Sequence, residues 1–430
     1  MQHFIGVVAD DTTGANDIGI MFRRGGYSAK VYFYSEEQAY KMDTNVVIVD
    51  TDSRLDSPEV SYNKVYNATE KLKEAGCKTF YNKTCSVFRG NIGVEFDAML
   101  DALEEEFAVI SLAYPLNGRK TVHGIHTVHG KKLEQSEFAK DPVHPTTESS
   151  LVSILQKQTA RLVSFIDIDV VRQGPARLTE EIEKKKRESN YCIIDSETQQ
   201  DLQIVAEAIK DIRVICGSSA LGEELPHYYS EQPIPTEIDD IKIENNQGVL
   251  VVAGSLTPQT KSQILFLKNK EIEQIIIDSR QLISSNDLAE IREIVEQATS
   301  ILLTGNDVLI MPNNRDEVVK ETKRIGEEKG YTPLETSKMV SAMLAEITAE
   351  IVQQISLKKL IVAGGDTSGT VIRKLRLEGN YILEEVDIGV PSIRAMGEDM
   401  FMVLKSGSFG KESFLMDAID HLRNLTLVTK

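Results

Sequence analysis

The sequence predicts an α/β fold made of two lobes, each a mostly parallel sheet flanked by helices. Three observations lead to this fold class. Short apolar or β-branched runs alternate with amphipathic helical patterns through most of the 430 residues. The alternation stops and restarts once, after a segment that follows neither period. Four strand-to-helix junctions are rich in Gly, Ser, Thr and Asp, which is typical of the ligand-binding ends of parallel strands.

The first lobe is expected over residues 1–230 and is interpreted as a substrate-binding domain. Its helical stretches carry apolar residues three and four positions apart, as residues 57–75, 93–106 and 178–189 do. The expected strands are residues 4–9, 29–34, 46–50, 79–82, 108–113, 164–167, 191–195 and 214–217.

A linker is expected at residues 231–247, where Pro233, Pro235 and clustered acids break both periodicities. The second lobe then covers residues 248–430 and is interpreted as a nucleotide-binding domain. Two such lobes commonly enclose a ligand, so the active site is expected in the interlobe cleft. The expected strands are residues 248–253, 275–278, 300–304, 357–363 and 400–406; the expected helices are 257–269, 287–300, 336–355 and 367–377.

Composition excludes several classes of partner. The formal net charge of −18 argues against nucleic acid as a partner, because the phosphate backbone repels such a surface. No apolar run approaches the length of a membrane span, and the N-terminal residues do not read as a signal peptide. The four cysteines form no CxxC pair, so reduced thiols in a cytoplasmic protein are expected. A homodimer is compatible with the sequence.

The first junction places two carboxylates, Asp10 and Asp11, directly after the first expected strand. A carboxylate there can orient a hydroxyl, accept its proton or help to hold Mg²⁺ during phosphoryl transfer. Asp17 extends the acidic character into the following helix. The structural alternative is that one aspartate caps this helix and the other is solvated.

Cationic and polar side chains follow two further strands of the first lobe. Arg54 comes after residues 46–50 and could clamp a carboxylate with two hydrogen bonds, or form a surface ion pair. A denser group after residues 79–82 suits a small polyhydroxylated anion. Within it, Cys85 is interpreted as a buried thiol rather than as a nucleophile. The candidate substrate-binding residues are Asp10, Arg54, Asn82, Lys83, Thr84, Cys85, Ser86 and Arg89.

Three histidines, His123, His126 and His129, invite a metal-site interpretation. Their spacing of three with glycines between suits neither one strand face nor a firm helix. A polar loop near the substrate is therefore favoured over a metal cluster, and no protein metal ligand is assigned.

The second lobe holds the remaining three junctions. Two glycines at 364–365 permit a tight turn, either Asp366 or Thr367 could cap the next helix, and the backbone N–H groups there can face phosphate. No GxGxxG follows the first strand, which weakens a dehydrogenase interpretation. The candidate ATP-binding residues are Ser255, Gly364, Gly365, Asp366, Thr367 and Gly410.

Taken in order, these motifs resemble the four-carbon acid sugar kinases over essentially the whole chain. Residues 9–17, 51–54 and 83–90, with the loops at 118–119 and 141–142, resemble the first domain of that family. Residues 254–258, 364–369 and 405–410 resemble its nucleotide-binding domain. One position departs, because many members carry an aspartate where this chain has Cys85, which puts the acid that is recognised in question.

The resemblance implies ATP-dependent phosphorylation of a tetronate, such as D-threonate or D-erythronate, at its terminal hydroxyl, with Mg²⁺ on the ATP. Arg54 and Lys83 are then expected to bind the acid's carboxylate, and Asp10 or Asp11 to act as the base, with Asp366 as a rival. A 2- or 3-keto-tetronate acceptor, a non-catalytic sugar-acid sensor and a nicotinamide-dependent dehydrogenase are the alternatives.

Overall fold

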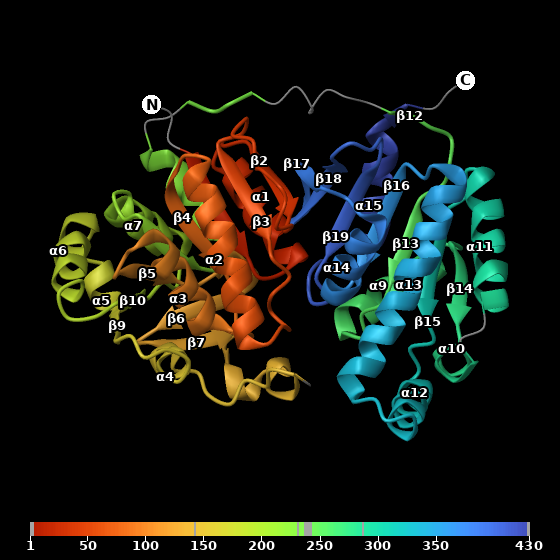
Figure 1. Cartoon of the computed structure of the whole chain (residues 1–430), viewed down its shortest axis with the longest axis horizontal. Helices are drawn as coiled ribbons and strands as arrows, with labels where there is room; N and C mark the ends of the chain where they lie inside the picture. The colour runs from red at the N-terminus through yellow and green to blue at the C-terminus, as the bar shows by residue number, and fades with distance from the viewer. Residues whose placement is uncertain (1–3, 142, 230–231, 236–242, 286–287, 428–430) are drawn as a thin grey trace. The chain divides into compact units, whose positions relative to one another are not determined.

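The protein divides into two compact units, residues 1–236 and 237–430. The computed structural model describes residues 4–427 except 142, 230–231, 236–242 and 286–287. Figure 1 draws the first unit in red to green and the second in green to blue. The expected linker, residues 231–247, includes 236–242, which lie outside the described residues.

The first unit contains an eight-stranded sheet in the order β2-β3-β1-β4-β11-β5-β10-β9. Every neighbouring pair in this order is parallel, which confirms the expected α/β class. The strands are β1 (Phe4–Ala9), β2 (Ala29–Phe33), β3 (Val46–Asp50), β4 (Cys77–Lys83), β5 (Ala108–Ser111), β9 (Val163–Ile166), β10 (Tyr191–Ile194) and β11 (Val214–Gly217).

Helices cover both faces of this sheet (Figure 1). On β4 the side chain of Asn82 reaches the carbonyl of Glu95 in α3, whereas the Lys83 ammonium lies over Gly14 in α1. Successive strand residues point to opposite faces, so α1 and α3 lie on opposite sides. The helices are α1 (Thr12–Arg24), α2 (Pro58–Glu74), α3 (Ile92–Leu103), α4 (Leu151–Gln156), α5 (Ile168–Val171), α6 (Pro175–Lys185), α7 (Gln199–Ile209) and α8 (Leu221–Glu224).

The histidine segment is a small antiparallel sheet and not the polar loop that the sequence favours. It consists of β6 (Arg119–Val122), β7 (Ile125–Val128) and β8 (Lys131–Lys132). His123-Gly124 and His129-Gly130 form its two tight turns, and all four residues have positive φ. This is the conformation of the two-residue hairpin turn whose twist matches paired strands, and the glycine-containing pairs permit it.

The second unit contains a seven-stranded sheet in the order β14-β15-β13-β16-β19-β18-β17. The pairs from β14 to β19 are parallel, and an antiparallel hairpin, β17–β18, extends the sheet from β19. The strands are β13 (Leu250–Ala253), β14 (Glu273–Ile277), β15 (Val308–Pro312), β16 (Lys359–Ala363), β17 (Gly379–Asp387), β18 (Val390–Ala395) and β19 (Phe401–Lys405), with a short separate pair, β12 (Ile243–Glu244) and β20 (Thr426–Leu427).

One predicted strand of this unit is wrong. Residues 300–304 were expected to be extended, but residues up to 303 belong to α11. Leu302 is buried and Leu303 is 58% exposed, as on a helix with one face on the core. The run of Ile301, Leu302 and Leu303 is too short for its period to separate the two states. The helices are α9 (Pro258–Asn269), α10 (Ser279–Ser285), α11 (Leu288–Leu303), α12 (Asp316–Glu328), α13 (Pro333–Ile355), α14 (Gly365–Leu375) and α15 (Phe414–Asn424).

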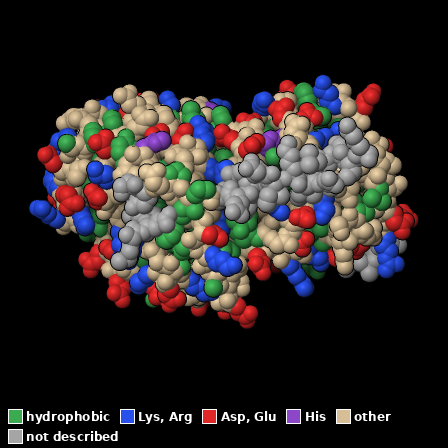
Figure 2. Space-filling view, turned by 90° about the horizontal axis from the view of Figure 1, so that it is seen from above, with side chains coloured by type: hydrophobic (Ala, Val, Ile, Leu, Met, Phe, Trp, Pro, Cys, Tyr) green, Lys and Arg blue, Asp and Glu red, His purple; other side chains and the backbone are tan. Residues whose placement is uncertain are grey.

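The surface and core agree with the composition. On the face in Figure 2, acidic and basic side chains are interspersed rather than collected by sign. All four cysteines are free thiols and buried, as expected. Among the described helices, none combines the length and the apolar character that crossing a bilayer requires.

Candidate active site

The first junction is organised by Arg54, which binds both adjacent aspartates. Its Nε and Nη2 donate to the two carboxylate oxygens of Asp10, each at 2.7 Å, and its Nη1 donates to Asp11 at 2.8 Å. Asp10 directly follows β1 and is 2% exposed. Asp11 is the N-cap of α1, where it accepts from the backbone N–H of Gly14 and from Thr13 Oγ1. One aspartate therefore caps the helix, while the other is buried rather than solvated.

The charges of this junction hold Asp11 ionised. Burial raises the pKa of Asp11, but the positive charges of Arg54 and Lys83 and the bonds from Thr13 and Gly14 outweigh it. The net pKa lies below the ordinary range. Arg54 is partly buried, which lowers its pKa, yet Asp10 and Asp11 raise its pKa well above the ordinary value. The fork of Arg54 thus already has two carboxylates of the chain itself as partners.

Lys83 lies beside this pair without a carboxylate of its own. The residue is 3% exposed, and its ammonium donates to the carbonyl of Thr84 at 3.1 Å. Among the described residues it has no ion-pair partner within 4.0 Å. A side chain starting at Gly14 would begin 2.8 Å from Lys83 Nζ and 2.4 Å from Asp11 Oδ1. Glycine at 14 is therefore what lets the ammonium approach the start of α1.

The neighbouring candidates after β4 are only partly paired. Asn82 donates to the carbonyl of Glu95, but within the described ranges its buried Oδ1 has no partner, and neither has the buried Thr84 Oγ1. The carbonyl of Ser86 contacts Nε2 of His126 at 3.0 Å. Buried polar groups without partners are rare in native proteins, and their gathering at one strand end indicates a place for a polar ligand.

Cys85 is paired with Arg89. The Arg89 Nε lies 3.3 Å from Cys85 Sγ, while its Nη1 donates to Asp141 at 2.6 Å. Burial raises the pKa of Cys85, but the charges of Arg89 and Arg54 outweigh it, and the net pKa is below that of a free thiol. The guanidinium of Arg89 thus favours the thiolate form of Cys85.

Two buried acids of this neighbourhood have raised pKa values that their positions in the sequence do not indicate. Glu95 in α3 accepts from Ser53 and Ser61, and burial together with the charge of Asp10 raises its pKa to about 8. Asp17 in α1 accepts from Ser219, and burial raises its pKa to about 6. A helical pattern alone marks Glu95 as an ordinary polar position, so no sequence signal separates it from a surface acid.

The three histidines have separate environments. His126 is fully buried between Thr121 and the carbonyl of Ser86, and burial lowers its pKa to about 3. The ring of His129 packs over Gly118, within 2.2 Å of where a side chain there would begin. His123 is exposed and its Nδ1 lies 2.7 Å from a carboxylate oxygen of Asp167.

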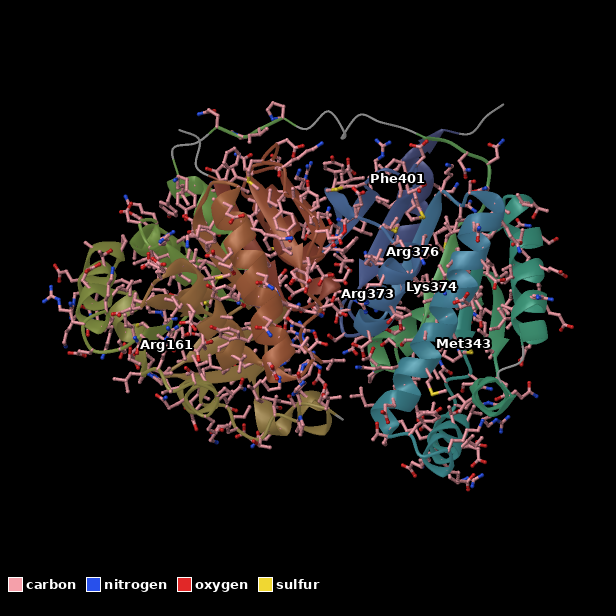
Figure 3. The ribbon with its side chains drawn as sticks, in the orientation of Figure 1. Arg161, Met343, Arg373, Lys374, Arg376 and Phe401 are labelled. Carbon is pink, nitrogen blue, oxygen red and sulfur yellow. The ribbon has the colours of Figure 1, made fainter. Side chains whose placement is uncertain are left out.

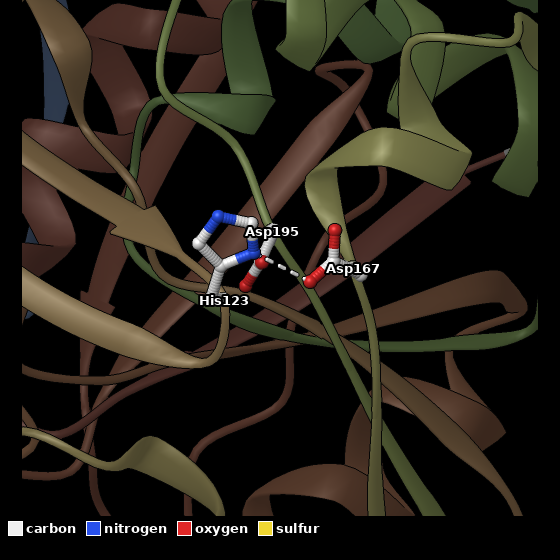
Figure 4. A group of neighbouring side chains, drawn as sticks. All are labelled: His123, Asp167 and Asp195. Atoms are coloured by element: carbon white, nitrogen blue, oxygen red, sulfur yellow. Dashed lines mark hydrogen bonds and ion pairs between the residues drawn. The ribbon is translucent and has the colours of Figure 1, made fainter.

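Figure 4 shows His123 with Asp167 and Asp195, whose ligand atoms lie within 4.8 Å of one another. Asp195 accepts from the backbone N–H groups of Gly124 and Ile168, and Asp167 caps the short helix α5. The two carboxylates therefore fasten the tip of the β6–β7 hairpin to the ends of β9 and β10.

In the second unit, three glycine junctions converge. Strand pairing aligns Ala253, Ala363 and Lys405, the last residues of β13, β16 and β19. The loops that follow are in contact: a side chain at Gly254 would begin 2.1 Å from Thr367 Oγ1. A side chain at Gly407 would begin 2.4 Å from Ser255 Oγ.

We call these loops, residues 254–257, 364–367 and 406–410, the glycine cradle. Gly364, at φ +134°, sits at its centre, in a conformation that favours glycine.

Lys405 and Gln263 hold the third loop in place. The buried Lys405 ammonium donates to Thr260, to Gln263 and to the carbonyl of Gly407. Gln263 in turn donates to the carbonyls of residues 409, 410 and 411. Gly410, at φ +83°, is not at a helix start, because α15 begins at Phe414. That junction is a tethered loop, whereas the sequence indicated a helix N-terminus.

The N-terminus of α14 opens into the cradle. The helix starts at Gly365 with Gly364 as its N-cap, so neither Asp366 nor Thr367 caps it, contrary to expectation. Asp366 is exposed in the first turn, where a carboxylate is favourable to the helix dipole. Figure 3 shows the cations Arg373, Lys374 and Arg376 at the opposite end of α14, where they complement that dipole.

Two family models match the chain. The model of a sugar-binding N-terminal domain matches residues 5–225, and that of a nucleotide-binding C-terminal domain matches residues 250–415. The first contains the Asp10–Arg54 junction and the second contains the glycine cradle.

Named relatives cover nearly the whole chain. A 3-oxo-tetronate kinase of Pseudomonas savastanoi pv. phaseolicola is 31% identical, covering 97% of each chain. A D-threonate kinase of Salmonella typhimurium is 28% identical, covering 97% of this chain and 98% of its own. Crystal structures of a Salmonella typhimurium LT2 protein (26% identical, TM-score 0.82, 96% and 98% covered) and a Haemophilus influenzae protein (27%, 0.74, 97% and 100%) share the fold. The chain belongs to the four-carbon acid sugar kinase family, with a sugar-binding and a nucleotide-binding domain.

Proposed function

We propose that this protein transfers the γ-phosphoryl group of ATP to the terminal hydroxyl of a four-carbon sugar acid such as D-threonate or D-erythronate. The observation that carries the proposal is Lys83, a buried ammonium with no carboxylate partner among the described residues, beside the Asp10–Arg54 pair. Asp11 and Asp17 interact with Lys83 through space, but neither forms a direct ion pair with it. A buried ammonium without a direct ion pair is costly. An acidic substrate supplies that ion pair.

Lys83 is the better partner for the carboxylate of the acceptor than Arg54. One of the three N–H groups of its ammonium is bonded to the Thr84 carbonyl, which leaves two donors. Arg54 instead directs three of its donors to Asp10 and Asp11. In this assignment Arg54 positions the two carboxylates, and Lys83 binds the acid.

Asp10 is the better candidate to orient the terminal hydroxyl and accept its proton. Asp11 accepts from Gly14, Thr13 and Arg54, so most of its acceptor capacity is used. Among the described residues, the Asp10 carboxylate accepts from Arg54 alone. Phosphoryl transfer depends mainly on positioning and charge, and a carboxylate fixed by a two-point bond meets that need.

The glycine cradle fits the phosphates of ATP. Side chains at Gly254 or Gly407 would fill it, and the N-terminus of α14 directs backbone N–H groups and a positive dipole end into it. The hydroxyls of Ser255 and Thr367 are further polar groups there. Mg²⁺ bound with ATP would offset the negative charge of the phosphates, and Asp366 is the carboxylate of the same turn.

A coupled ADP-release assay over the four-carbon sugar acids tests the proposal, with Mg²⁺ and with EDTA. ADP release that needs both a sugar acid and Mg²⁺ is expected. No ADP with any acid would overturn the kinase assignment and leave a sugar-acid sensor.

The same screen separates the second candidate, a keto-tetronate kinase. That candidate is favoured by the relative named 3-oxo-tetronate kinase, at 31% identity. A higher kcat/KM for the 3-oxo acid than for D-threonate and D-erythronate would select it.

Lys83→Met tests the carrying observation. The KM for the acid should rise about 100-fold or more while the KM for ATP stays constant, because a charged hydrogen bond to the acid is lost. Lys78→Met is the matched control, since Lys78 lies on the same strand but is exposed. Equal KM values for the acid in both variants would reject Lys83 as the carboxylate partner.

A further inference from the structure

A second polar group lies beside Lys83, around Gly217 at the end of β11. Strand pairing aligns Lys83 with Gly217, and Gly217 with Ser111. Paired residues of parallel strands share one face, so Lys83 and Ser111 flank a position that has no side chain. This is also the face that α1 covers.

Helix α1 contributes Asp17 to the same place. Its Oδ2 accepts from Ser219 Oγ at 2.6 Å, and Ser219 follows β11. Its Oδ1 is buried and has no hydrogen-bond partner in the described part of the chain, and the same is true of Ser111 Oγ. Lys83 is the charged group that acts most strongly on Asp17. We call Asp17, Lys83, Ser111 and Ser219 the Gly217 cluster.

The Gly217 cluster is unfavourable for the folded chain alone. Burial raises the pKa of Asp17 to about 6, although Lys83 and the Ser219 bond counteract it. A buried carboxylate oxygen and a buried hydroxyl without partners each cost free energy. Such costs are typical of sites built for a ligand rather than for stability.

We propose that Asp17 accepts a hydrogen bond from the hydroxyl on the carbon next to the carboxylate of the acceptor, and so selects 2-hydroxy acids. The inference rests on the proposed function, in which Lys83 binds that carboxylate. The carboxylate and the 2-hydroxyl of such an acid are on adjacent carbons, so their partners on the protein must also be neighbours. Lys83 is the charged group that acts most strongly on Asp17, and the Oδ1 of Asp17 is buried without a partner among the described residues.

The selectivity follows from which analogues leave Asp17 unpaired. A 2-deoxy acid has no hydroxyl to donate, and a 2-oxo acid brings a second acceptor against the carboxylate. Sites built to pair a hydroxyl reject analogues that lack it strongly. A 3-deoxy or 3-oxo acid keeps the 2-hydroxyl, and Asp17 does not discriminate against it.

Measuring variants of Asp17 with substrate analogues that lack one hydroxyl tests this assignment. The kcat/KM is measured for wild type, Asp17→Ala and Asp17→Asn. The acids are the preferred tetronate, 3,4-dihydroxybutanoate (2-deoxy) and 2,4-dihydroxybutanoate (3-deoxy). Asp17→Ala should lower kcat/KM about 100-fold for the two acids with a 2-hydroxyl, but less than about threefold for the 2-deoxy acid. Equal losses on all three acids would overturn the proposal and leave Asp17 a structural counter-ion of Lys83.

Two controls keep the result interpretable. Asp211→Asn, an exposed aspartate of the same unit, should change none of the rates. If Asp17→Ala does not fold, Ser219→Ala serves instead, since it removes the bond that orients Asp17. The fall in kcat/KM of Ser219→Ala should depend on the acid in the same way but be smaller. An equal fall for all three acids would reject the proposal. Failure of the wild type to release ADP with any acid would instead count against the proposed function.

Discussion

Arg54 and Asp10 form a two-point ion pair, Nε to Oδ2 and Nη2 to Oδ1, each at 2.7 Å. The two residues are 44 positions apart and follow neighbouring strands, β3 and β1. The Asp10 side chain is 1% exposed and that of Arg54 17%. The parallel bonds fix the plane of the carboxylate as well as its position, so the orientation of a candidate base is set by a side chain from another strand.

Replacing Arg54 by lysine should separate charge from geometry. Arg54→Lys keeps the charge but loses the fork, so kcat/KM should fall about 100-fold with a small loss of stability. Arg54→Met leaves two buried carboxylates uncompensated and should cost about 3–5 kcal/mol of unfolding free energy. Urea unfolding and ADP-release kinetics measure the two effects. Arg177→Lys, in an exposed ion pair with Glu181, should change neither.

Substitutions of Asp10 and Asp11 should have different effects on activity and stability. Asp10→Asn should lower kcat about 100-fold or more, because it removes the oriented carboxylate, and should also lower the melting temperature, because it breaks the two-point ion pair with Arg54. Asp11→Asn should lower stability by about 1 kcal/mol, since it weakens the cap of α1, with a smaller effect on kcat. Single-turnover kinetics and thermal unfolding give both quantities. If both variants keep full kcat, neither residue is the base, and Asp366→Asn becomes the decisive variant.

Negative charge at position 85 should favour activity. Cys85→Ser replaces a thiol whose pKa is lowered by Arg89 and Arg54 with a hydroxyl that does not ionise, so kcat/KM should fall about tenfold, whereas Cys85→Asp should retain most of it and change the ranking of acids. A substrate panel on both variants measures this. Cys192→Ser, at a buried thiol whose pKa burial raises to about 12, should alter stability alone. Equal activity of the serine and aspartate variants would show that charge at position 85 is irrelevant.

Glu95 predicts a stability difference that depends on pH. Its pKa is raised to about 8 in the fold by burial and by Asp10, from an ordinary value of 4.5. Glu95 therefore stabilises the folded state fully below about pH 4.5, and this stabilisation is lost as the pH rises towards about 8.

Glu95→Gln lacks this titration and keeps an oxygen for Ser53 and Ser61. The melting temperature of Glu95→Gln relative to wild type should therefore rise by several degrees from about pH 5 to about pH 8. The exposed Glu183→Gln should show a constant difference. A constant difference for Glu95→Gln as well would mean that Glu95 is ionised in the fold.

The glycine cradle should be sensitive to a single methyl group. A side chain at Gly407 would begin 2.4 Å from Ser255 Oγ, so Gly407→Ala should raise the KM for ATP at least about tenfold. Gly330→Ala is the control: it is strained by its φ of +86° but would meet nothing within 4 Å. It should cost about 1 kcal/mol of stability and leave the KM for ATP unchanged. An unchanged KM in Gly407→Ala would remove the cradle from the ATP site.

Local patterns were enough for the fold class and for most elements. Buried parallel strands read as continuous Val and Ile runs, as residues 46–50 and 359–363 do, and helices between them show a 3.6-residue period. Several elements were not predicted, among them β15 at 308–312 and the small sheet of β6, β7 and β8. The end of α11 at 300–303 is too short to show its period, and the β17–β18 hairpin has exposed glutamates at 384–385 that break its alternation.

The order of residues along the chain is enough to place Asp10, Lys83 and Ser255 after apolar runs, near the ends of expected strands. Only the tertiary structure decided their partners. In the folded chain Arg54 binds Asp10 and Asp11, and Ala253 pairs with Ala363. Lys83 forms no ion pair with a carboxylate among the described residues. The physical reason is that hydrogen bonds and strand register join residues tens to hundreds of positions apart, and local periodicity carries no information about that pairing order.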